Sequence, residues 1–283
     1  MCLDSRIRGT LCLCWLLAAL GAWLQDAAAA GLEYPTSAVA AKDGAIYVAD
    51  QYLPGVSRIR DGQAEAYFKA SKKFRTPLNS VRAVALDAQG RLLVSDAATS
   101  EVYRFDKSGK PAALTGGVVG VPNDIAVDTA GTIFVADLAM HCVWRVASDG
   151  GKPKKVADVT APRGLAVDSN GNLWVVSTKQ PQLIRISPDG KAKPIVEGRV
   201  FEFPHDVAVD DQRNAYVTDG YAGAIWKISS SGQAAKWVSG APLAGPGGIS
   251  WRGTKMLVAD PKAKNVFEIT ADGKVTPLLK QQQ

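Results

Sequence analysis

Short apolar runs alternate with polar turns along most of the chain, and residues 119–158 show one full period of this pattern. Within that period, apolar runs at residues 125–127, 133–135 and 143–146 are separated by polar segments. A short fourth run follows the turn formed by Asp149 and Gly150. Runs of this length bounded by Asp and Gly are typical of strands rather than helices. Four strands in about forty residues indicate one blade of a β-propeller.

Two markers repeat in phase along the chain. The first is the residue that ends the second run of each unit, with spacings of 46, 41, 40, 42 and 41 residues: Asp50, Asp96, Asp137, Ser177, Asp219 and Asp260. The second is the glycine of the third turn, 12 or 13 residues further on: Gly62, Gly109, Gly150, Gly190, Gly232 and Gly273. We therefore predict an all-β fold, a six-bladed β-propeller of four-stranded antiparallel blades that spans residues 31–283. Residues 275–280 supply a fourth strand for the last unit, so each blade is expected to form from one contiguous segment without strand exchange between the chain ends.

The repeated residues have structural interpretations. The Asp markers are expected to accept backbone N–H bonds in their own loops, with Ser177 in the same role. Five tryptophans fall in strand positions and are expected to be wedges between blades: Trp144, Trp174, Trp226, Trp237 and Trp251. Arg213 stands where the first turn of most other units has glycine, so this turn is expected to be strained or of another type.

Residues 1–30 have the three-part form of a secretory signal peptide. Arg6 and Arg8 precede an apolar stretch at residues 11–24, and an alanine-rich segment ends at Ala30. The apolar stretch is shorter than the roughly 20 residues that span a membrane. We therefore expect cleavage near residues 28–30 and a soluble mature chain that is periplasmic or secreted, without stable membrane insertion.

Cysteine usage and charge narrow the range of partners. Cys2, Cys12 and Cys14 fall in the predicted signal peptide, so Cys142 would be the only thiol of the mature chain and no intramolecular disulfide could form. Its thiol is expected to be a small buried apolar group. The formal net charge of +6 affects partners and solubility rather than fold. Nucleic acid is not an expected partner in an exported protein.

Alignment of the units on their markers places one residue of each unit at the mouth of the central channel. These residues are Thr36, Arg82, Asn123, Arg163, His205 and Gly247. They form a ring that is rich in hydrogen-bond donors and has no carboxylate at that level. The loops that follow the markers are expected to add a second ring that includes Tyr52, His141, Lys179 and Tyr221.

The ring predicts an anion site. Arg presents a rigid fork of donors that suits a carboxylate or a phosphate. The segment 69–82 is expected to bring further positive charge to the rim, from Lys69, Lys72, Lys73 and Arg75. We therefore predict that a small anionic ligand binds to Arg82, Asn123, Arg163, His205 and Tyr221. His141 is expected to be an ordinary loop residue.

The units resemble NHL repeats and, more widely, the six-bladed propellers of the gluconolactonase and regucalcin group, over about residues 34–280. The segments that carry the resemblance are VPNDIAVDTAGTIFVAD, APRGLAVDSNGNLWVVS and FPHDVAVDDQRNAYVTDGY. This resemblance implies a divalent metal held on the axis by a Glu, two Asn and an Asp. Asn123 matches one Asn, whereas Thr36, Arg163 and His205 stand at the other three positions. A guanidinium repels a cation that needs oxygen ligands, so no metal is expected there.

The chain is also similar to the amidating lyase of peptide hormones, another six-bladed propeller, whose zinc is held by three His in Pro-His motifs. Pro204-His205 matches one such motif, and Asp219-Gly220-Tyr221 resembles the segment that carries the active-site tyrosine of that enzyme. The loop at residues 139–141 resembles another of its segments. The chain has only 2 histidines, His141 and His205, so a three-His zinc site cannot form within one chain.

We therefore predict an exported NHL-type propeller whose funnel binds a small anionic molecule, a peptide or a protein partner, with no cofactor and no metal. The alternative is an enzyme, a lactone hydrolase or lyase of the gluconolactonase-like or amidating-lyase-like type with an altered metal site. Whether the chain is an enzyme stays open, because no nucleophile elbow, phosphate loop, paired catalytic carboxylate or Cys/His metal cluster is recognised in the sequence that would decide it.

Overall fold

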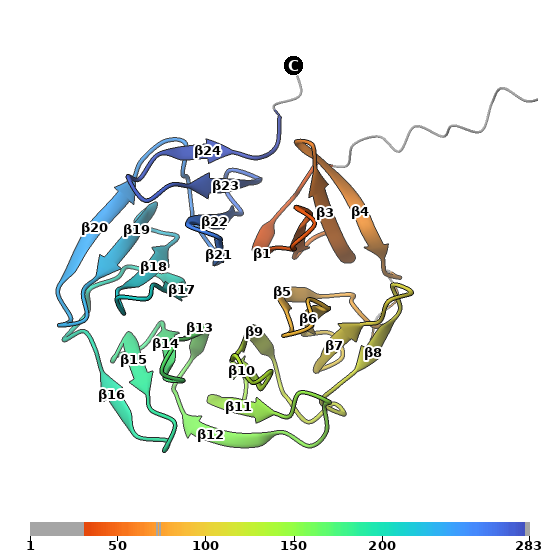
Figure 1. The fold of residues 1–283 in the computed structure, drawn as a ribbon, viewed down its shortest axis with the longest axis horizontal. Helices are drawn as coiled ribbons and strands as arrows, with labels where there is room; N and C mark the ends of the chain where they lie inside the picture. Colours follow the sequence, from red (N-terminus) through yellow and green to blue (C-terminus); the bar gives the residue numbers. More distant parts are fainter. Residues whose placement is uncertain (1–30, 72, 74, 281–283) are drawn as a thin grey trace, which may run out of the picture.

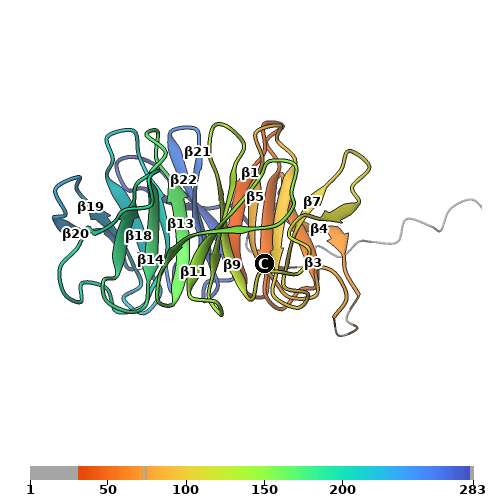
Figure 2. The same ribbon diagram turned by 90° about the horizontal axis from the view of Figure 1, so that it is seen from below.

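The computed structural model describes residues 31–71, 73 and 75–280, which form six four-stranded antiparallel sheets around a central axis (Figure 1). Figure 2 shows the same ring from the side, with the sheets standing next to one another. No helix occurs among the described residues, so this part of the chain contains no helix that is long and apolar enough to cross a membrane. The predicted all-β, six-bladed propeller is confirmed. The predicted signal peptide, residues 1–30, and Lys72 lie outside the described residues.

The first three blades follow the chain in order. Blade 1 contains β1 (Pro35–Ala40), β2 (Ile46–Asp50), β3 (Gly55–Arg60) and β4 (Gln63–Lys69). Blade 2 contains β5 (Val81–Leu86), β6 (Leu92–Asp96), β7 (Glu101–Phe105) and β8 (Pro111–Ala113). Blade 3 contains β9 (Pro122–Val127), β10 (Ile133–Asp137), β11 (Cys142–Val146) and β12 (Lys154–Asp158).

The last three blades complete the ring. Blade 4 contains β13 (Pro162–Val167), β14 (Leu173–Ser177), β15 (Leu183–Ile186) and β16 (Ala192–Pro194). Blade 5 contains β17 (Pro204–Val209), β18 (Ala215–Asp219), β19 (Ala224–Ile228) and β20 (Ala234–Ser239). Blade 6 contains β21 (Ile249–Arg252), β22 (Lys255–Asp260), β23 (Asn265–Ile269) and β24 (Val275–Pro277).

The ring closes without strand exchange, as predicted. Blade 1 is built from β1 to β4 and blade 6 from β21 to β24, each in sequence order. β24 is shorter than the predicted strand at residues 275–280, and the residues after it fasten the two ends of the chain. Lys280 N donates to Gly62 O of blade 1 at 3.1 Å, and Leu278 and Leu279 pack on the hydrophobic cluster shared by blades 6 and 1.

The hydrophobic core lies between blades rather than at one centre. In the cluster between blades 1 and 6, for example, Val48 and Ile59 pack with Leu257 and Val266, and all four side chains are buried. Burial of one such side chain stabilises the fold by about 1.5 to 3 kcal/mol. The second strand of each blade is almost entirely buried, and its sequence is apolar up to the marker residue except at Ser95, Thr218 and Lys255.

The marker residues hold the loops of the funnel face. Asp137 accepts bonds from Gly120 N, Val121 N and Met140 N and from Trp144 Nε1, at 2.7 to 3.0 Å. Burial alone would raise the pKa of Asp137, but these bonds outweigh burial and lower the pKa. The same arrangement recurs at Asp50, Asp96, Asp219 and Asp260. The predicted structural role of the row of carboxylates is thus confirmed.

Two local predictions also hold. Ser177 replaces the marker Asp with its hydroxyl, which donates to Thr160 O at 2.6 Å and accepts from Lys179 N at 2.9 Å. Arg213 has φ 62°, in the left-handed region that glycine occupies in the equivalent turns. The turn of blade 5 therefore has the same conformation as the first turns of the other blades, but Arg213 is strained there because it has a side chain.

A β-bulge at the start of the inner strand shapes the channel. In blades 1 to 5 the register between the inner and second strands shifts within the first residues, as between Pro162 and Leu165 in blade 4 and between Pro204 and Val207 in blade 5. A bulge interrupts the alternation of side chains between the two faces of a strand. Two consecutive residues of each blade therefore line the channel instead of one.

Candidate functional site

Two stacked rings of residues line the channel at the funnel end. The upper ring is the predicted one: Thr36, Arg82, Asn123, Arg163, His205 and Gly247. The lower ring holds the residue that follows each of these: Ser37, Ala83, Asp124, Gly164, Asp206 and Gly248. Together the rings enclose a cavity of about 40 Å³, large enough for a small ion or a few waters but not for a whole organic ligand.

The two guanidiniums of the upper ring are incompletely hydrogen-bonded. Arg82 Nη1 donates to Gln51 Oε1 at 3.3 Å, and the Nε atoms of Arg82 and Arg163 are buried without a hydrogen-bond partner among the described residues. Neither side chain forms a salt bridge within the described chain. Burial and then the charge of Arg82 lower the pKa of Arg163. The ring therefore concentrates positive charge that no described carboxylate neutralises directly.

His205 is neutral and fixed in one tautomer. Arg163 Nη2 lies 3.0 Å from His205 Nδ1, and because a guanidinium only donates, Nδ1 must accept and the ring proton lies on Nε2. Burial and then the charge of Arg163 lower the pKa of His205 to about 4. A Cβ at Gly220 would lie 2.7 Å from His205 Nε2, so the chain passes close to that nitrogen. Both ring nitrogens of His205 are thus enclosed by protein.

Asn123 and Thr36 join neighbouring blades. Asn123 Nδ2 donates to Arg163 O at 2.7 Å, and Thr36 Oγ1 donates to Arg82 O at 2.8 Å. Each bond runs from one blade to the next around the axis. These two polar residues therefore position the strands that carry the guanidiniums.

Tyr221 lies at the rim and not in the cavity. The ring of Tyr221 stacks on that of Phe203, with centroids 4.7 Å apart. Phe203 also contacts Arg163, whose guanidinium lies 5.3 Å from the centroid of the Phe203 ring. Lys262 Nζ lies 5.7 Å from the centroid of Tyr221. The structure thus brings four of the five predicted ligand residues to one cavity and connects Tyr221 to them through Phe203.

Large apolar side chains are exposed around the funnel. Tyr52, Met140 and Tyr221 are 60%, 54% and 66% exposed, and each lies in the loop that follows the second strand of blades 1, 3 and 5 respectively. Val118, in the segment that leads into blade 3, is also exposed on this face. Tyr52 packs on Tyr34 with centroids 5.0 Å apart. The four exposed side chains form an apolar rim on part of the funnel face, whereas the loops of blades 4 and 6 carry Lys179 and Lys262.

Several predicted rim residues lie elsewhere or have structural roles. Lys69 ends β4, and Lys73 and Arg75 lie on the segment that follows, which Figure 1 shows at the outer edge of the ring. All three are exposed, and none of them lines the channel cavity. The prediction that this segment brings charge to the funnel was wrong in that respect. The extra residues sit at the end of an outer strand, so the loop extends away from the axis.

His141, Lys179 and Cys142 have no special environment. His141 has φ 53°, is exposed, and accepts a bond from Ala161 N at its Nδ1, so it is the loop residue that was predicted. Lys179 is exposed in the next blade and does not line the cavity. Cys142 is buried, and burial followed by the charge of Asp137 raises the pKa of its thiol to about 11.

The lower ring contains a pair of carboxyl groups that the sequence did not reveal as neighbours. Asp124 of blade 3 and Asp206 of blade 5 are hydrogen-bonded to each other across blade 4. Asp124 Oδ2 also accepts from Leu165 N, and Asp206 Oδ2 from Ile249 N, both at 2.8 Å. The prediction of a channel mouth free of carboxylates therefore holds for the upper ring but not for the residue directly below it.

The two carboxyl groups share a proton. Burial and then the neighbouring Asp206 raise the pKa of Asp124 well above its usual value, and burial raises the pKa of Asp206 to about 6. Two carboxylates in contact in a buried site cannot both ionise without cost. At neutral pH the pair therefore carries less negative charge than two separate Asp residues, and it neutralises only part of the charge of Arg82 and Arg163.

Glycine is needed at two lower-ring positions. A Cβ at Gly164 would lie 2.2 Å from Asp206 Oδ1 and 2.4 Å from Asp206 Cα. A Cβ at Gly248 would lie 2.5 Å from Thr36 O and 2.8 Å from Ser37 Cα. The absence of side chains in blades 4 and 6 thus allows the residues of blades 5 and 1 to enter the axis.

The donor set does not fit the metal that the resemblance implies. Among the described residues, no group of three or more His, Cys, Asp and Glu side chains is arranged to hold a metal ion. Of the upper ring, only Asn123 and Thr36 offer side-chain oxygens, and two guanidiniums stand beside them. Hard cations require several oxygen ligands and are repelled by guanidinium. We therefore derive no reaction step through a metal.

Below the lower ring, the channel widens again. A second hollow of about 260 Å³ follows the axis toward the opposite face and is lined mainly by apolar strand residues such as Val84, Ile125 and Leu165. Ser37, Asp124 and Asp206 border both this hollow and the funnel cavity. The lower ring therefore lies where the two hollows meet.

Comparison with known proteins places the chain among propellers of this kind. A family model described as the SMP-30/Gluconolactonase/LRE-like region matches residues 23–218, which confirms the predicted resemblance. The chain is similar in structure to a virginiamycin B lyase from Staphylococcus aureus, at 16% identity and a TM-score of 0.67 over 90% of this chain and 88% of the lyase. It is similar to a gluconolactonase from Xanthomonas campestris, at 19% identity and a TM-score of 0.71 over 82% and 84% of the two chains. A chain of a nidogen/laminin complex matches at 18% identity and a TM-score of 0.67 over 79% of this chain and 89% of that one. At these identities the structural likeness concerns the fold alone.

Proposed function

The chain belongs to the SMP-30/gluconolactonase/LRE-like family, and from that premise we propose that it is an exported propeller whose funnel binds a small organic acid with an apolar body. The observation that carries the proposal is the pair of buried, incompletely bonded guanidiniums in the upper ring. Export rests on the signal-peptide pattern of residues 1–30. N-terminal sequencing of protein recovered outside the cytoplasm tests that part.

The anionic group of the ligand would bind to Arg82 and Arg163. Both Nε atoms are buried without a partner, and the charge of Arg82 disfavours the charged form of Arg163. A carboxylate between the two side chains would accept bonds from both and remove their repulsion. The cavity of about 40 Å³ has room for such a group but not for the rest of the molecule.

The body of the ligand would lie above the ring, against the apolar rim. Tyr52, Met140 and Tyr221 are the most exposed large apolar side chains of the described chain, and all three lie on the funnel face. Exposed apolar surface bordered by polar residues marks a binding site more often than scattered single residues do. A peptide with a free carboxyl end and an apolar last residue has the same chemistry as a small apolar acid, so both belong to the proposed ligand class.

A metal-dependent hydrolase or lyase is the less well supported function. The similar lyase and gluconolactonase share only the fold with this chain. His205, the one histidine on the axis, uses Nδ1 to accept from Arg163 and presents Nε2 to Gly220. Neither nitrogen is free to hold a metal or to remove a proton from a ligand in this arrangement.

A matched pair of probes tests the proposal. Phenylacetate and phenylacetamide have the same apolar body, but only the first is an anion. We expect phenylacetate to raise the melting temperature of the purified protein and phenylacetamide to have no comparable effect. At 100 times its dissociation constant a ligand adds about 2.7 kcal/mol of stability, or roughly 5 to 10 °C for a domain of this size.

Arginine variants identify the site. Arg163→Ala should weaken phenylacetate binding at least tenfold, because one of the two partners of the carboxylate is lost. Arg185→Ala, a change of the same charge in the same blade at a side chain that lies over Trp174, should bind as the wild type does. Equal shifts with the acid and the amide, or equal binding by both variants, would show that the guanidiniums are structural and that the funnel has no anion site.

A further inference from the structure

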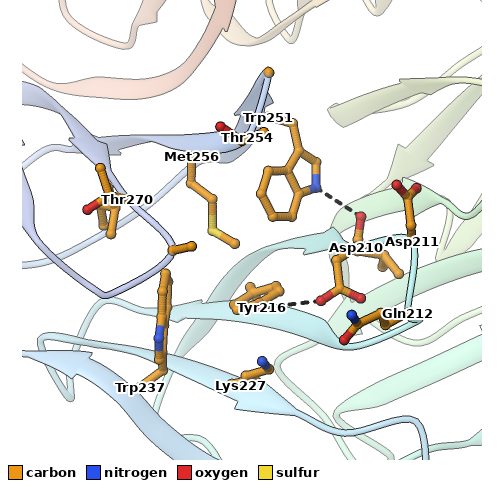
Figure 3. A pocket seen from close by; sticks show the side chains of 14 residues that line it. Asp210, Asp211, Gln212, Tyr216, Lys227, Trp237, Trp251, Thr254, Met256 and Thr270 are labelled. Carbon is orange, nitrogen blue, oxygen red and sulfur yellow. Dashed lines mark hydrogen bonds between the residues drawn. The ribbon is translucent and has the colours of Figure 1, made fainter.

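A groove between blades 5 and 6 opens on the face opposite the funnel (Figure 3). It lies at the first and third turns of the blades, and its lining includes Tyr216, Trp237, Trp251 and Met256. Its volume of about 480 Å³ lies within the roughly 300 to 1,000 Å³ of small-molecule sites. The proposed acid site at the funnel uses none of these residues.

The volume of the groove follows from the blade architecture and is not distinctive. The cleft between blades 3 and 4 contains a hollow of about 450 Å³ at the equivalent place. Phe134 stands there in the position of Tyr216, and Val156 in that of Trp237. The hollow between blades 3 and 4 is also bordered by Arg145, Lys154 and Lys155. What distinguishes the groove between blades 5 and 6 is therefore its chemistry.

Three aromatic rings form the walls of the groove. Tyr216 is almost fully buried at its floor, and Trp237 and Trp251 meet Tyr216 edge-on, with centroids 5.0 and 5.8 Å away. Trp251 pairs with Met256 and is the only aromatic residue at this position of an inner strand, where the other five blades have Ala40, Leu86, Val127, Val167 and Val209. Both indoles pack on the hydrophobic cluster between blades 5 and 6, as the predicted wedges would, but they are partly exposed and also face the groove.

Polar groups of both kinds border the aromatic walls. Asp210, Asp211 and Gln212 lie at one end and Thr254 lies across from them, as Figure 3 shows. Asp210 Oδ2 accepts from Tyr216 at 3.2 Å, and Trp251 Nε1 donates to Val209 O at 2.9 Å, so the floor and one wall are held in place. Asp211 forms no salt bridge with another described residue and is exposed.

Lys227 completes the polar border. Its Nζ lies 5.4 Å from the centroid of Tyr216, and it forms no salt bridge with a described carboxylate. In blade 1 the equivalent Arg58 is paired with Glu65, whereas the residue opposite Lys227 is Ala235. The groove therefore offers an ammonium donor at Lys227 and carboxylate acceptors at Asp210 and Asp211.

We propose that this groove binds a saccharide. A sugar ring has an apolar C–H face that stacks on an indole, and hydroxyl groups around its edge that need both donors and acceptors. The two indoles, the carboxylate of Asp211 and the ammonium of Lys227 supply these partners in one groove. An anion would be repelled by Asp210 and Asp211, and an organic cation would have to displace Lys227 from the ring of Tyr216.

Calorimetric titration with cellobiose, maltose, chitobiose and lactose tests the proposal. At least one of the four is expected to bind saturably with a dissociation constant in the millimolar range or below. Trp251→Val introduces the residue found in three other blades and should weaken that binding at least tenfold. Phe134→Leu removes the aromatic ring from the cleft between blades 3 and 4 and should leave binding unchanged.

The outcomes separate this site from the funnel. Absence of saturable binding by all four disaccharides, unchanged binding by Trp251→Val, or equal loss in Phe134→Leu would overturn the proposal, as would binding of tetramethylammonium chloride in place of the sugars. Asp211→Asn changes an exposed residue and should weaken binding at least fivefold, which tests the site even if Trp251→Val fails to fold. Arg163→Ala should not affect saccharide binding, so the failure of one site leaves the other testable.

Discussion

The two rings of the channel lie one residue apart in every blade, yet the guanidiniums of the upper ring and the polar side chains of the lower ring are used in opposite ways. In the upper ring, Arg82 and Arg163 keep buried Nε atoms without described partners. In the lower ring, Ser37, Asp124 and Asp206 each bond to a backbone N–H of the next blade, at Val84, Leu165 and Ile249. Blades 1, 3 and 5 supply these side chains, and blades 2, 4 and 6 supply Ala83, Gly164 and Gly248.

The difference separates a structural layer from a layer that is available for binding. The lower ring joins the blades in pairs and satisfies N–H groups that the bulges leave outside the sheet ladders. The upper ring rests on this layer and retains unused donors. Changes in the lower ring should therefore affect stability most, and changes in the upper ring should affect ligand binding most.

The largest effect is expected for Gly164→Ala in the lower ring. The added methyl would lie 2.2 Å from Asp206 Oδ1 and 2.4 Å from Asp206 Cα, so blade 5 would have to move and the carboxyl pair would be broken. We expect a loss of about 3 kcal/mol or more in the free energy of unfolding, measured by urea denaturation. Gly247→Ala is the control in the upper ring, where the nearest atom is Pro261 Cδ at 3.3 Å, and it should cost less than about 1 kcal/mol. Similar losses for the two variants would contradict the separation of the layers.

A pH effect of similar size is expected from His205 and the carboxyl pair, which act in opposite directions. The pKa of His205 is lowered to about 4, so its contribution to stability is complete above about pH 6.5 and is lost as the pH falls toward 4. The pKa of Asp206 is raised to about 6, so its contribution is complete below about pH 4 and is lost as the pH rises through 6. In the wild type the two dependences offset each other between these values.

His205→Gln should remove one side of this balance. The glutamine side chain would still accept a bond from Arg163 but would not titrate. The stability of the variant would therefore fall with rising pH, because only the contribution of the carboxyl pair would still depend on pH. We expect the stability of the wild type relative to the variant to increase by about 3 kcal/mol between pH 4 and 6.5, as measured by denaturation at several pH values. The charged groups around His205, namely Arg163, Asp219 and Lys262, are the same in both proteins. A constant difference between the two proteins across the range would show that His205 is not buried as the structure indicates.

A smaller effect distinguishes the two members of the carboxyl pair. Asp206 accepts bonds from Val207 N and Ile249 N on its two oxygens, whereas Asp124 donates the shared proton to Asp206. Asp206→Asn places an amide donor against a backbone donor and should cost about 1 to 3 kcal/mol. Asp124→Asn can still donate to Asp206 and should cost less. Thermal denaturation of both variants measures the difference, and a larger loss for Asp124→Asn would reverse the assignment of the proton.

The smallest effect on stability is expected in the upper ring. Arg163→Ala loses the hydrogen bond to His205, but it also removes a buried charge and its repulsion from Arg82. The free energy of unfolding should therefore change by less than about 1 kcal/mol. A double-mutant cycle of Arg82→Ala and Arg163→Ala should show an unfavourable coupling of about 0.5 kcal/mol or more that decreases at high salt. A favourable coupling would mean that the two side chains stabilise each other, and the anion site would lose its physical basis.

Much of this architecture was predictable from the sequence because the repeat has a strict period. The markers at Asp137 and its equivalents fixed the number of blades, the order of the strands and the residues at the channel mouth. Arg82, Asn123, Arg163 and His205 indeed line one cavity. The positions of these residues depend only on the phase of the repeat, and neither a bulge nor a different turn type changes that phase.

The lower ring was missed because it depends on a local detail. In a regular strand, the residue after Asn123 or His205 would point to the other face of the sheet. The bulges at the start of β9 and β17 turn Asp124 and Asp206 into the channel as well. The sequence holds a signal for this pair, since only blades 3 and 5 place an Asp directly before the apolar run of the inner strand, but the signal has meaning only once the bulge is known.

The groove beside Trp251 shows the same limit. The period placed Trp237 and Trp251 in strands and so predicted that both are wedges between blades. Whether an indole is enclosed depends on the side chains that the neighbouring blade brings against it, and these vary from cleft to cleft. Packing between units, unlike the path of the chain within a unit, is not periodic.

Ser37, Asp124 and Asp206 border both the funnel cavity and the apolar hollow that follows it along the axis. The funnel cavity of about 40 Å³ has room for one small acidic group. Two guests therefore cannot occupy the ring of guanidiniums together. Exchange of one guest for another is then limited by the departure of the first, and a higher concentration of the second does not hasten it.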